Sequence, residues 1–136
     1  MNTGHWTSVC TIDPENHYGF IYNITHRATG KVYIGKKVYR FKKKLPPLKG
    51  KKRRRIVYYD SDWKEYTGSS KSLNEDIDKY GKDAFDFLIV SQHKYNSSLW
   101  YAEIKAIVEC DALLHPDRYY NGQIPAMKFR PKLDDK

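Results

Sequence analysis

Glu103 is the residue whose type and position most suggest chemistry, because it lies inside a helical stretch expected over residues 99–114. On a helical wheel of about 100° per residue, Trp100 and Ile107 belong to one apolar arc, and Glu103 falls within it. A buried carboxylate is costly unless it is paired or binds a metal ion. The sequence therefore predicts that Glu103 is either a metal ligand or the partner of a Tyr or Lys in a β-hairpin expected over residues 18–35.

Positive charge is the second chemical feature, and it is concentrated in one segment. Of the 25 Lys and Arg residues, 13 lie between Lys31 and Arg55, with no acidic residue among them. The whole chain has a net charge of +9, whereas the residues outside this segment, 12 basic and 16 acidic, have a net charge of −4. This asymmetry favours a polyanionic partner, most commonly nucleic acid. The alternative is a solvated basic loop without a partner.

Length and composition limit the elements that can position these groups. The chain has 136 residues and a mass of 16.1 kDa, which fits one domain and excludes a separate large recognition domain. Its 12 Tyr, 5 Phe and 3 Trp indicate a packed core. No apolar run is long enough to span a membrane, and no secretory signal is visible at the start. The two cysteines, 100 positions apart, exclude a disulfide framework, so we expect a cytoplasmic location.

Three strands are predicted. Residues 18–25 and 32–35 are rich in β-branched and aromatic residues, and a turn at residues 26–30 with Gly30 at its end joins them into a hairpin. Residues 85–90 predict a third strand by the same criterion. A later turn is expected at residues 119–122.

Two helices are predicted. Ser70 or Ser72 can cap a helix that runs to about Tyr80 and ends at Gly81. Residues 96–98 can cap the helix that carries Glu103, and Pro116 follows its end. Strands and helices in this order predict a small α/β domain.

The remaining segments are predicted to be irregular. Residues 1–17 show no periodicity and are interpreted as an N-terminal extension, whereas residues 125–136 form a polar tail. Pro46-Pro47 and Gly50 interrupt the basic segment, so residues 40–56 are predicted to be a long exposed loop. The folded domain is expected to span residues 18–124.

The hairpin carries a recognisable pair of motifs. Gly19-Phe20-Ile21-Tyr22, followed eleven positions later by Tyr33-Ile34-Gly35, resembles the two halves of the GIY-YIG nuclease signature, with one residue inserted after the first Gly. Residues 61–70 are similar to the corresponding part of Seg-type phage homing endonucleases. The resemblance covers residues 18–122. It implies a GIY-YIG-type fold, with a central three-stranded antiparallel sheet flanked by helices.

The resemblance also implies an active site. Glu103 corresponds to the family's metal-binding glutamate, and Mg²⁺ (or Mn²⁺) held by one carboxylate, waters and phosphate suits phosphodiester hydrolysis. Tyr22 corresponds to the tyrosine that acts as a base or proton relay, and we expect neighbouring cations to lower the pKa of its hydroxyl. Tyr33 is expected to orient water or phosphate. The alternative for both tyrosines is ordinary packing on a β-strand.

Three further residues are implied by their positions relative to these motifs. Lys36 directly follows the second motif and is expected to reach the scissile phosphate. The family has an arginine about ten positions after the second Tyr, but position 43 is Lys, so Arg40 is the nearest candidate and residues 53–55 are alternatives. Asn121 is expected to position the metal-binding carboxylate or the substrate, unless it only forms a turn.

The sequence therefore predicts a metal-dependent endonuclease that cuts double-stranded DNA, of phage homing type or a DNA-degrading enzyme, acting as a monomer or homodimer. A phage-encoded enzyme would act in the host cytoplasm. The alternatives are a non-catalytic nucleic-acid-binding module and an RNA-directed nuclease. The residues predicted to contact nucleic acid are Lys37, Lys42, Lys43, Lys44, Lys51, Lys52, Arg53, Arg54 and Arg55.

Overall fold

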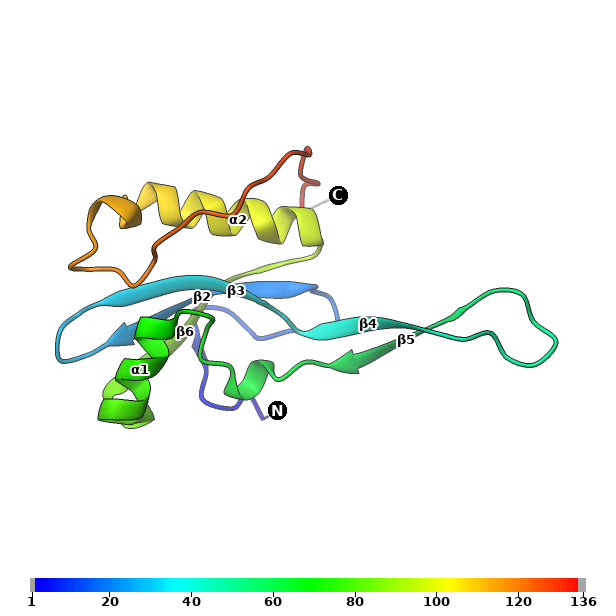
Figure 1. Cartoon of the computed structure of the whole chain (residues 1–136), viewed down its shortest axis with the longest axis horizontal. Helices are drawn as coiled ribbons and strands as arrows, with labels where there is room; N and C mark the ends of the chain where they lie inside the picture. Colours follow the sequence, from blue (N-terminus) through cyan, green and yellow to red (C-terminus); the bar gives the residue numbers. More distant parts are fainter. Residues whose placement is uncertain (1, 135–136) are drawn as a thin grey trace.

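A mixed four-stranded β-sheet forms the centre of the protein in the computed structural model, which describes residues 2–134 (Figure 1). Strands β2 (Gly19–His26) and β3 (Val32–Val38) form the predicted hairpin, and Gly30 adopts a φ of 75° in its turn. Strand β6 (Phe85–His93) pairs antiparallel with the other edge of β2. The α/β class and these three antiparallel strands agree with the sequence analysis.

The prediction of three strands omitted a fourth. Strand β1 (Thr7–Ser8) pairs in parallel with β6, so the sheet order is β1-β6-β2-β3. The preceding Trp6 is only 4 % exposed, and its indole N–H donates to the carbonyl of Trp63. Part of the predicted irregular extension therefore belongs to the core. A strand of two residues has no readable alternation, and the aromatic packing of Trp6 is what holds it in place.

Both predicted helices are present. Helix α1 (Lys71–Tyr80) begins after Ser70, whose hydroxyl accepts from the Leu73 N–H, and ends at Gly81, where φ is 84°. Helix α2 (Asn96–Glu109) is shorter than the predicted stretch to residue 114. Asp111 adopts a left-handed conformation that stops the α-helix, and the 3-10 helix Ala112–Leu114 follows. Two further 3-10 helices span Trp63–Glu65 and Lys82–Ala84.

The two helices lie on opposite faces of the sheet (Figure 1). Alternate residues of β2 point to each face, and all are apolar from Phe20 to Tyr22, as expected for a central strand covered on both sides. The face towards α1 is aromatic and includes Phe20 and Tyr22, whereas the face towards α2 is aliphatic and includes Ile21 and Leu99. Glu103 comes from the helix on the aliphatic face.

Residues 40–56 are not the irregular loop that the sequence analysis predicted. Strands β4 (Arg40–Leu45) and β5 (Arg55–Asp60) form a separate two-stranded antiparallel sheet that projects from the body (Figure 1). We call residues 40–60 the arm and residues 46–54 its tip. Pro46-Pro47 and Gly50 lie in the tip, where they interrupt no strand, and the repulsion between lysines is relieved because the arm is exposed.

The chain after α2 returns to the sheet and to the start of α2. Tyr119 forms a parallel bridge to Val32 of β3. In the polar tail, the Asp134 carboxylate accepts from the Ser98 hydroxyl at 2.6 Å and the Lys94 N–H at 3.0 Å. Within residues 2–134, no helix is both long and apolar enough to cross a lipid bilayer.

Candidate active site

A cleft of about 180 Å³ opens beside β3, where side chains from both faces of the sheet meet around its edge. Four of the predicted catalytic residues line it: Tyr33, Lys36, Glu103 and Asn121. The other lining residues are Ile34, Ser69, Ile107, Gln123 and Pro125.

Glu103 projects from α2 towards β3 and is only 7 % exposed. Its Oε1 lies 3.5 Å from Lys36 Nζ, and this nitrogen lies 4.5 Å from the centre of the Trp100 ring. The pairing with a lysine of the hairpin is the alternative that the helical wheel left open. Burial nevertheless raises the pKa of Glu103 despite the attraction of Lys36, so the carboxylate is only partly compensated.

The oxygen donors at this cleft fit a hard divalent cation. In the part of the chain that the structure describes, no three His, Cys, Asp or Glu side chains come together, and Glu103 is the one carboxylate among the residues that line the cleft. Mg²⁺ is commonly bound by one or two carboxylates while it keeps several waters and contacts substrate phosphates. A partly compensated buried carboxylate at an open cleft suits that mode of binding.

Tyr33 lines the same cleft as Glu103 and contacts a tight loop before α1. Its hydroxyl hydrogen-bonds to Ser69 Oγ at 3.1 Å. Gly68 has a φ of 82°, and a Cβ there would lie 3.0 Å from the Tyr33 ring and 3.2 Å from the Tyr22 hydroxyl. A side chain at Gly68 would therefore strain the backbone and press on both tyrosines.

Asn74 of α1 holds this loop in place. Its side-chain NH₂ donates to the carbonyls of Gly68 at 3.1 Å and Ser70 at 2.8 Å, and its oxygen accepts from the Thr67 hydroxyl at 2.6 Å. The sequence analysis assigned no role to Gly68, Ser69 or Asn74. The glycine and serines before a predicted helix were the available signal, but a contact between Ser69 and Tyr33 spans 36 positions and has no local pattern.

Tyr22 lies directly behind the cleft and is 1 % exposed. It pairs with Gly35 across the hairpin, where a Cβ would lie 2.4 Å from its hydroxyl oxygen. The glycine of the second motif is thus required for Tyr22 to fit. Burial, followed by the nearby Tyr33 and Tyr66, raises the pKa of Tyr22 well above 10. This direction is opposite to the lowering expected from neighbouring cations, because burial dominates.

Asn121 fixes the edge of β3. Its Oδ1 accepts from the Ile34 N–H at 2.9 Å, and its Nδ2 donates to the Ile34 carbonyl at 2.8 Å. Asn121 is 8 % exposed, so these bonds occupy a buried amide. It therefore acts on the strand that carries Tyr33 and Lys36, and its predicted role in positioning the carboxylate or the substrate stays a prediction.

Arg40 lies outside the cleft. Its guanidinium pairs with Glu15 at 2.7 Å and with Asp60 at 3.6 Å, at the root of the arm. Its predicted role at the scissile phosphate stays a prediction, and this position does not favour it. Lys37 lies beside Tyr66. Its Nζ is 3.9 Å from the centre of the Tyr66 ring and 2.7 Å from the Asp62 carboxylate.

The other predicted nucleic-acid-binding residues do not line the cleft. They are all exposed along the arm: Lys42, Lys43, Lys44, Lys51, Lys52, Arg53, Arg54 and Arg55. Among the possible arginines, Arg55 donates from Nε to the Pro46 carbonyl at 3.3 Å, which closes the base of the tip.

Comparison with known families identifies one match. The family model SegE_GIY-YIG, described as "Putative endonuclease segE, GIY-YIG domain", matches residues 4–124. The match includes β1 as well as the hairpin, both helices and Asn121. No curated protein and no solved structure matches the chain significantly.

Proposed function

The chain belongs to the SegE-type GIY-YIG endonuclease family, and from this premise we propose that it is a metal-dependent endonuclease that hydrolyses phosphodiester bonds of double-stranded DNA. One observation carries the proposal: the buried Glu103 carboxylate opens into a cleft that it shares with the Tyr33 hydroxyl and the Lys36 ammonium. A module that only binds nucleic acid gains nothing from a carboxylate aimed at a phosphate-binding surface, because like charges repel.

Glu103 would hold Mg²⁺ or Mn²⁺ in this proposal. When bound, a divalent ion neutralises charge on the phosphoryl oxygens and lowers the pKa of a coordinated water. Lys36 is the nearest cation to Glu103 and would contact a phosphate oxygen beside it. Tyr33 would orient water or phosphate through its hydroxyl, whose position is fixed by Ser69.

Tyr22 would serve as a proton relay behind the cleft. Because burial keeps its pKa well above 10, its hydroxyl is protonated at neutral pH and can donate a hydrogen bond. A base role would require a cation close enough to reverse that shift. Asn121 is a positioning residue in this scheme, and Arg40 a contact to DNA outside the cleft.

The arm cations and Lys37 would supply contacts to the DNA phosphates. These contacts carry no sequence information but set the affinity and its salt dependence. A phage homing or DNA-degrading role, a host cytoplasmic location, and action as a monomer or homodimer belong to the same proposal.

The experiment is incubation of supercoiled plasmid with the full chain in Mg²⁺, in Mn²⁺ and in EDTA. We expect cleavage with either metal and none in EDTA. Glu103→Ala should cut at least a hundredfold more slowly, since a charge-stabilising group supplies about 3 kcal/mol. Glu109→Ala is the matched control, because Glu109 is on the same helix but pairs with Lys105 at the surface.

Three outcomes would contradict the proposal. Full activity of Glu103→Ala would remove Glu103 from the mechanism. Binding without cleavage in any metal would favour the non-catalytic module. Cleavage of structured RNA but not of plasmid would favour the RNA-directed nuclease.

A further inference from the structure

The arm is a two-stranded ribbon with its own regular geometry. Six cross-strand pairs run from Arg40 opposite Asp60 to Leu45 opposite Arg55. At about 3.3 Å per residue the paired part is about 20 Å long, and its two strands lie about 5 Å apart. Figure 1 shows it projecting away from the four-stranded sheet, with the tip at the far end.

Large apolar side chains are exposed on both faces of the arm. Tyr58 is 65 % exposed and Tyr59 is 50 % exposed. Phe41, Ile56 and Val57 are also exposed. A two-stranded hairpin on its own is marginally stable in water, and exposed apolar surface of this kind marks an interaction site. The arm therefore presents a surface suited to being covered by a partner.

The charge of the arm identifies the chemistry of that partner. Residues 40–60 hold ten Lys and Arg residues and a single acidic residue, Asp60. Asp60 already pairs with Arg40 at the root. The partner must therefore be strongly anionic and must also offer apolar or aromatic surface for the rings, a combination that stacked bases between phosphate backbones provide.

A hollow of about 700 Å³ lies between the root of the arm and the body. Three cations, Arg40, Lys42 and Lys94, line it together with aromatic rings from both sides. Glu15, which pairs with Arg40, and Tyr18 line the body side, and Phe41 and Tyr58 line the arm side. The hollow therefore offers basic side chains to a phosphate group that lies beside the arm.

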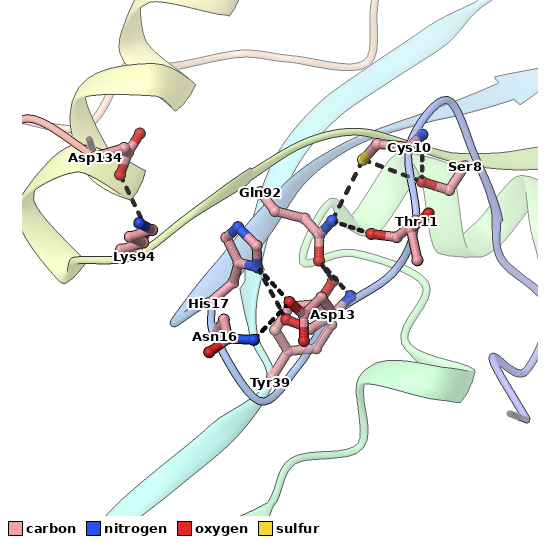
Figure 2. A network of polar contacts seen from close by, with 10 residues as sticks. All are labelled: Ser8, Cys10, Thr11, Asp13, Asn16, His17, Tyr39, Gln92, Lys94 and Asp134. Atoms are coloured by element: carbon pink, nitrogen blue, oxygen red, sulfur yellow. Dashed lines mark hydrogen bonds and ion pairs between the residues drawn. The ribbon is translucent and has the colours of Figure 1, made fainter.

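The wall of this hollow is held by the polar network in Figure 2. Gln92 of β6 accepts from the Asp13 N–H and from the Tyr39 hydroxyl, both at 2.8 Å, and donates to the Thr11 carbonyl at 2.7 Å. Tyr39 directly precedes β4. The Gln92 side chain thus fixes the position of the segment that forms one wall of the hollow with respect to the root of the arm.

We propose that the arm lies in the major groove of double-stranded DNA, with one flanking backbone seated in the hollow at its root. The major groove, about 12 Å wide, admits a two-stranded β-ribbon without deformation, whereas the minor groove, about 6 Å wide, must be widened and bent to take one. In this position the exposed rings face base edges, and the lysines and arginines of the arm reach phosphates. The arm is then the part of the molecule that reads sequence. The proposal rests on the proposed function for its choice of substrate.

The same geometry excludes A-form double-stranded RNA as the arm's ligand. The major groove of A-form RNA is deep and too narrow for side chains to read. Binding through the arm should therefore distinguish a DNA duplex from an RNA duplex of the same sequence.

The test is fluorescence anisotropy with a labelled DNA duplex and the full chain carrying Glu103→Ala, so that cleavage does not interfere. Methyl green, a major-groove ligand, should displace the protein, and netropsin, a minor-groove ligand, should not. The matching RNA duplex should bind at least tenfold more weakly. Replacement of Lys51, Lys52, Arg53, Arg54 and Arg55 by Ser should flatten the log–log salt dependence by several units, at about 0.9 per lost phosphate contact.

A control variant removes the same charge from the body instead of the arm. Five of the exposed lysines of the body are replaced by Ser: Lys71, Lys79, Lys82, Lys105 and Lys128. We expect this variant to keep the methyl green sensitivity and most of the salt slope. Thermal melting of both variants shows whether each is folded. Guanine N7 methylation interference, measured on the wild-type footprint, tests major-groove contact without any arm variant.

Displacement by netropsin but not methyl green would overturn the proposal, as would equal salt slopes for the two variants or no interference by N7 methylation. These results are independent of catalysis. Wild-type protein that binds in the major groove but never cuts would overturn the proposed nuclease function and leave the arm's role standing. Cleavage by protein whose arm lies outside the major groove would overturn the arm's role and leave the proposed nuclease function standing.

Discussion

Strands β3 and β4 follow one another in the chain with only Tyr39 between them, yet their surroundings are opposite. Along β3, Gly35 touches Tyr22 and Lys36 pairs with a buried carboxylate. Along β4, residues 42–44 are exposed on a ribbon that projects from the body. The first region has little room for change, so a substitution there should alter fold and chemistry together. In the second, a substitution should alter the affinity for DNA or the sequence preference and leave the fold of the body and the chemistry unchanged.

The largest effect is expected from Tyr22→Phe, which tests whether the packed region around β3 carries the chemistry. The change keeps the ring and removes only a hydroxyl, so the free energy of unfolding should fall by about 1 kcal/mol. Cleavage should fall at least a hundredfold, because general acid–base groups contribute about that much or more. Single-turnover cleavage at saturating DNA, together with urea unfolding, measures both quantities.

Tyr18→Phe is a suitable control for Tyr22→Phe, because Tyr18 is 38 % exposed and lies at the hollow instead of the cleft. Its cleavage rate at saturating DNA should be unchanged. Normal cleavage by Tyr22→Phe would mean that the first motif is structural only.

Gly35→Ala tests how tightly the cleft side of β3 is packed. The new methyl group would lie 2.4 Å from the Tyr22 hydroxyl, so the ring or the strand must shift. Overpacking of this kind costs about 1–3 kcal/mol of unfolding free energy. Gly122→Ala is the matched control, since a Cβ there meets nothing within 4 Å. Equal melting temperatures for the two variants would show that the site is more adaptable than its geometry suggests.

His5 allows a pH test of the support behind the cleft loop. Its Nε2 bonds to the Tyr66 carbonyl at 2.9 Å, and Nδ1 is buried without a partner in the described residues. Burial, assisted by Lys82, lowers the pKa of His5 to about 4. As the pH falls below about 6.5, His5 therefore binds a proton in the unfolded chain but not in the folded chain. The free energy of unfolding falls as the pH drops from 6.5 towards 4.

The expected loss for His5 is about 1 kcal/mol at pH 4.5, a value reduced for its partial exposure. Unfolding of wild type and His5→Phe between pH 7 and pH 4.5 measures it as a difference, which removes the contributions of other groups. Parallel stability curves for the two proteins would contradict the prediction.

The smallest effect on stability is expected in the arm. Tyr59 contacts Phe41 across the ribbon, with ring centres 5.5 Å apart, and such pairs contribute about 0.2–1 kcal/mol. Tyr59→Ser should speed amide exchange in β4 and β5 and weaken DNA binding, while the melting temperature of the body stays the same. A large drop in that temperature would show that the arm and the body unfold together.

The elements with long periodic patterns could be predicted from the sequence. The hairpin, β6, α1 and most of α2 follow alternation, caps and breakers that are local in the chain. Glu103 could be singled out because a carboxylate within an apolar arc needs compensation. The sequence left its partner open between a Tyr and a Lys of the hairpin, because a helical wheel gives the face on which a residue lies but not the residue that contacts it. In the structure the partner is Lys36.

The errors lie where tertiary contacts outweigh local pattern. Trp6 anchors β1 through Trp63, 57 positions away, so nothing near it in sequence predicts a strand. The arm has weak alternation and many like charges, and cross-strand pairs such as Phe41 with Tyr59 make it a ribbon. The pKa of Tyr22 shifts upward mainly because of burial, which the sequence does not report.

The bonds between Asn121 and Ile34 join positions 87 residues apart and have a consequence for the order of folding. Contacts at such separation form late, because a long loop must close before they are gained. The hairpin can form early, but the edge of β3 that faces Glu103 is completed only when residue 121 docks. During refolding, tryptophan fluorescence should therefore recover before cleavage does, and the returning activity would time the final docking step.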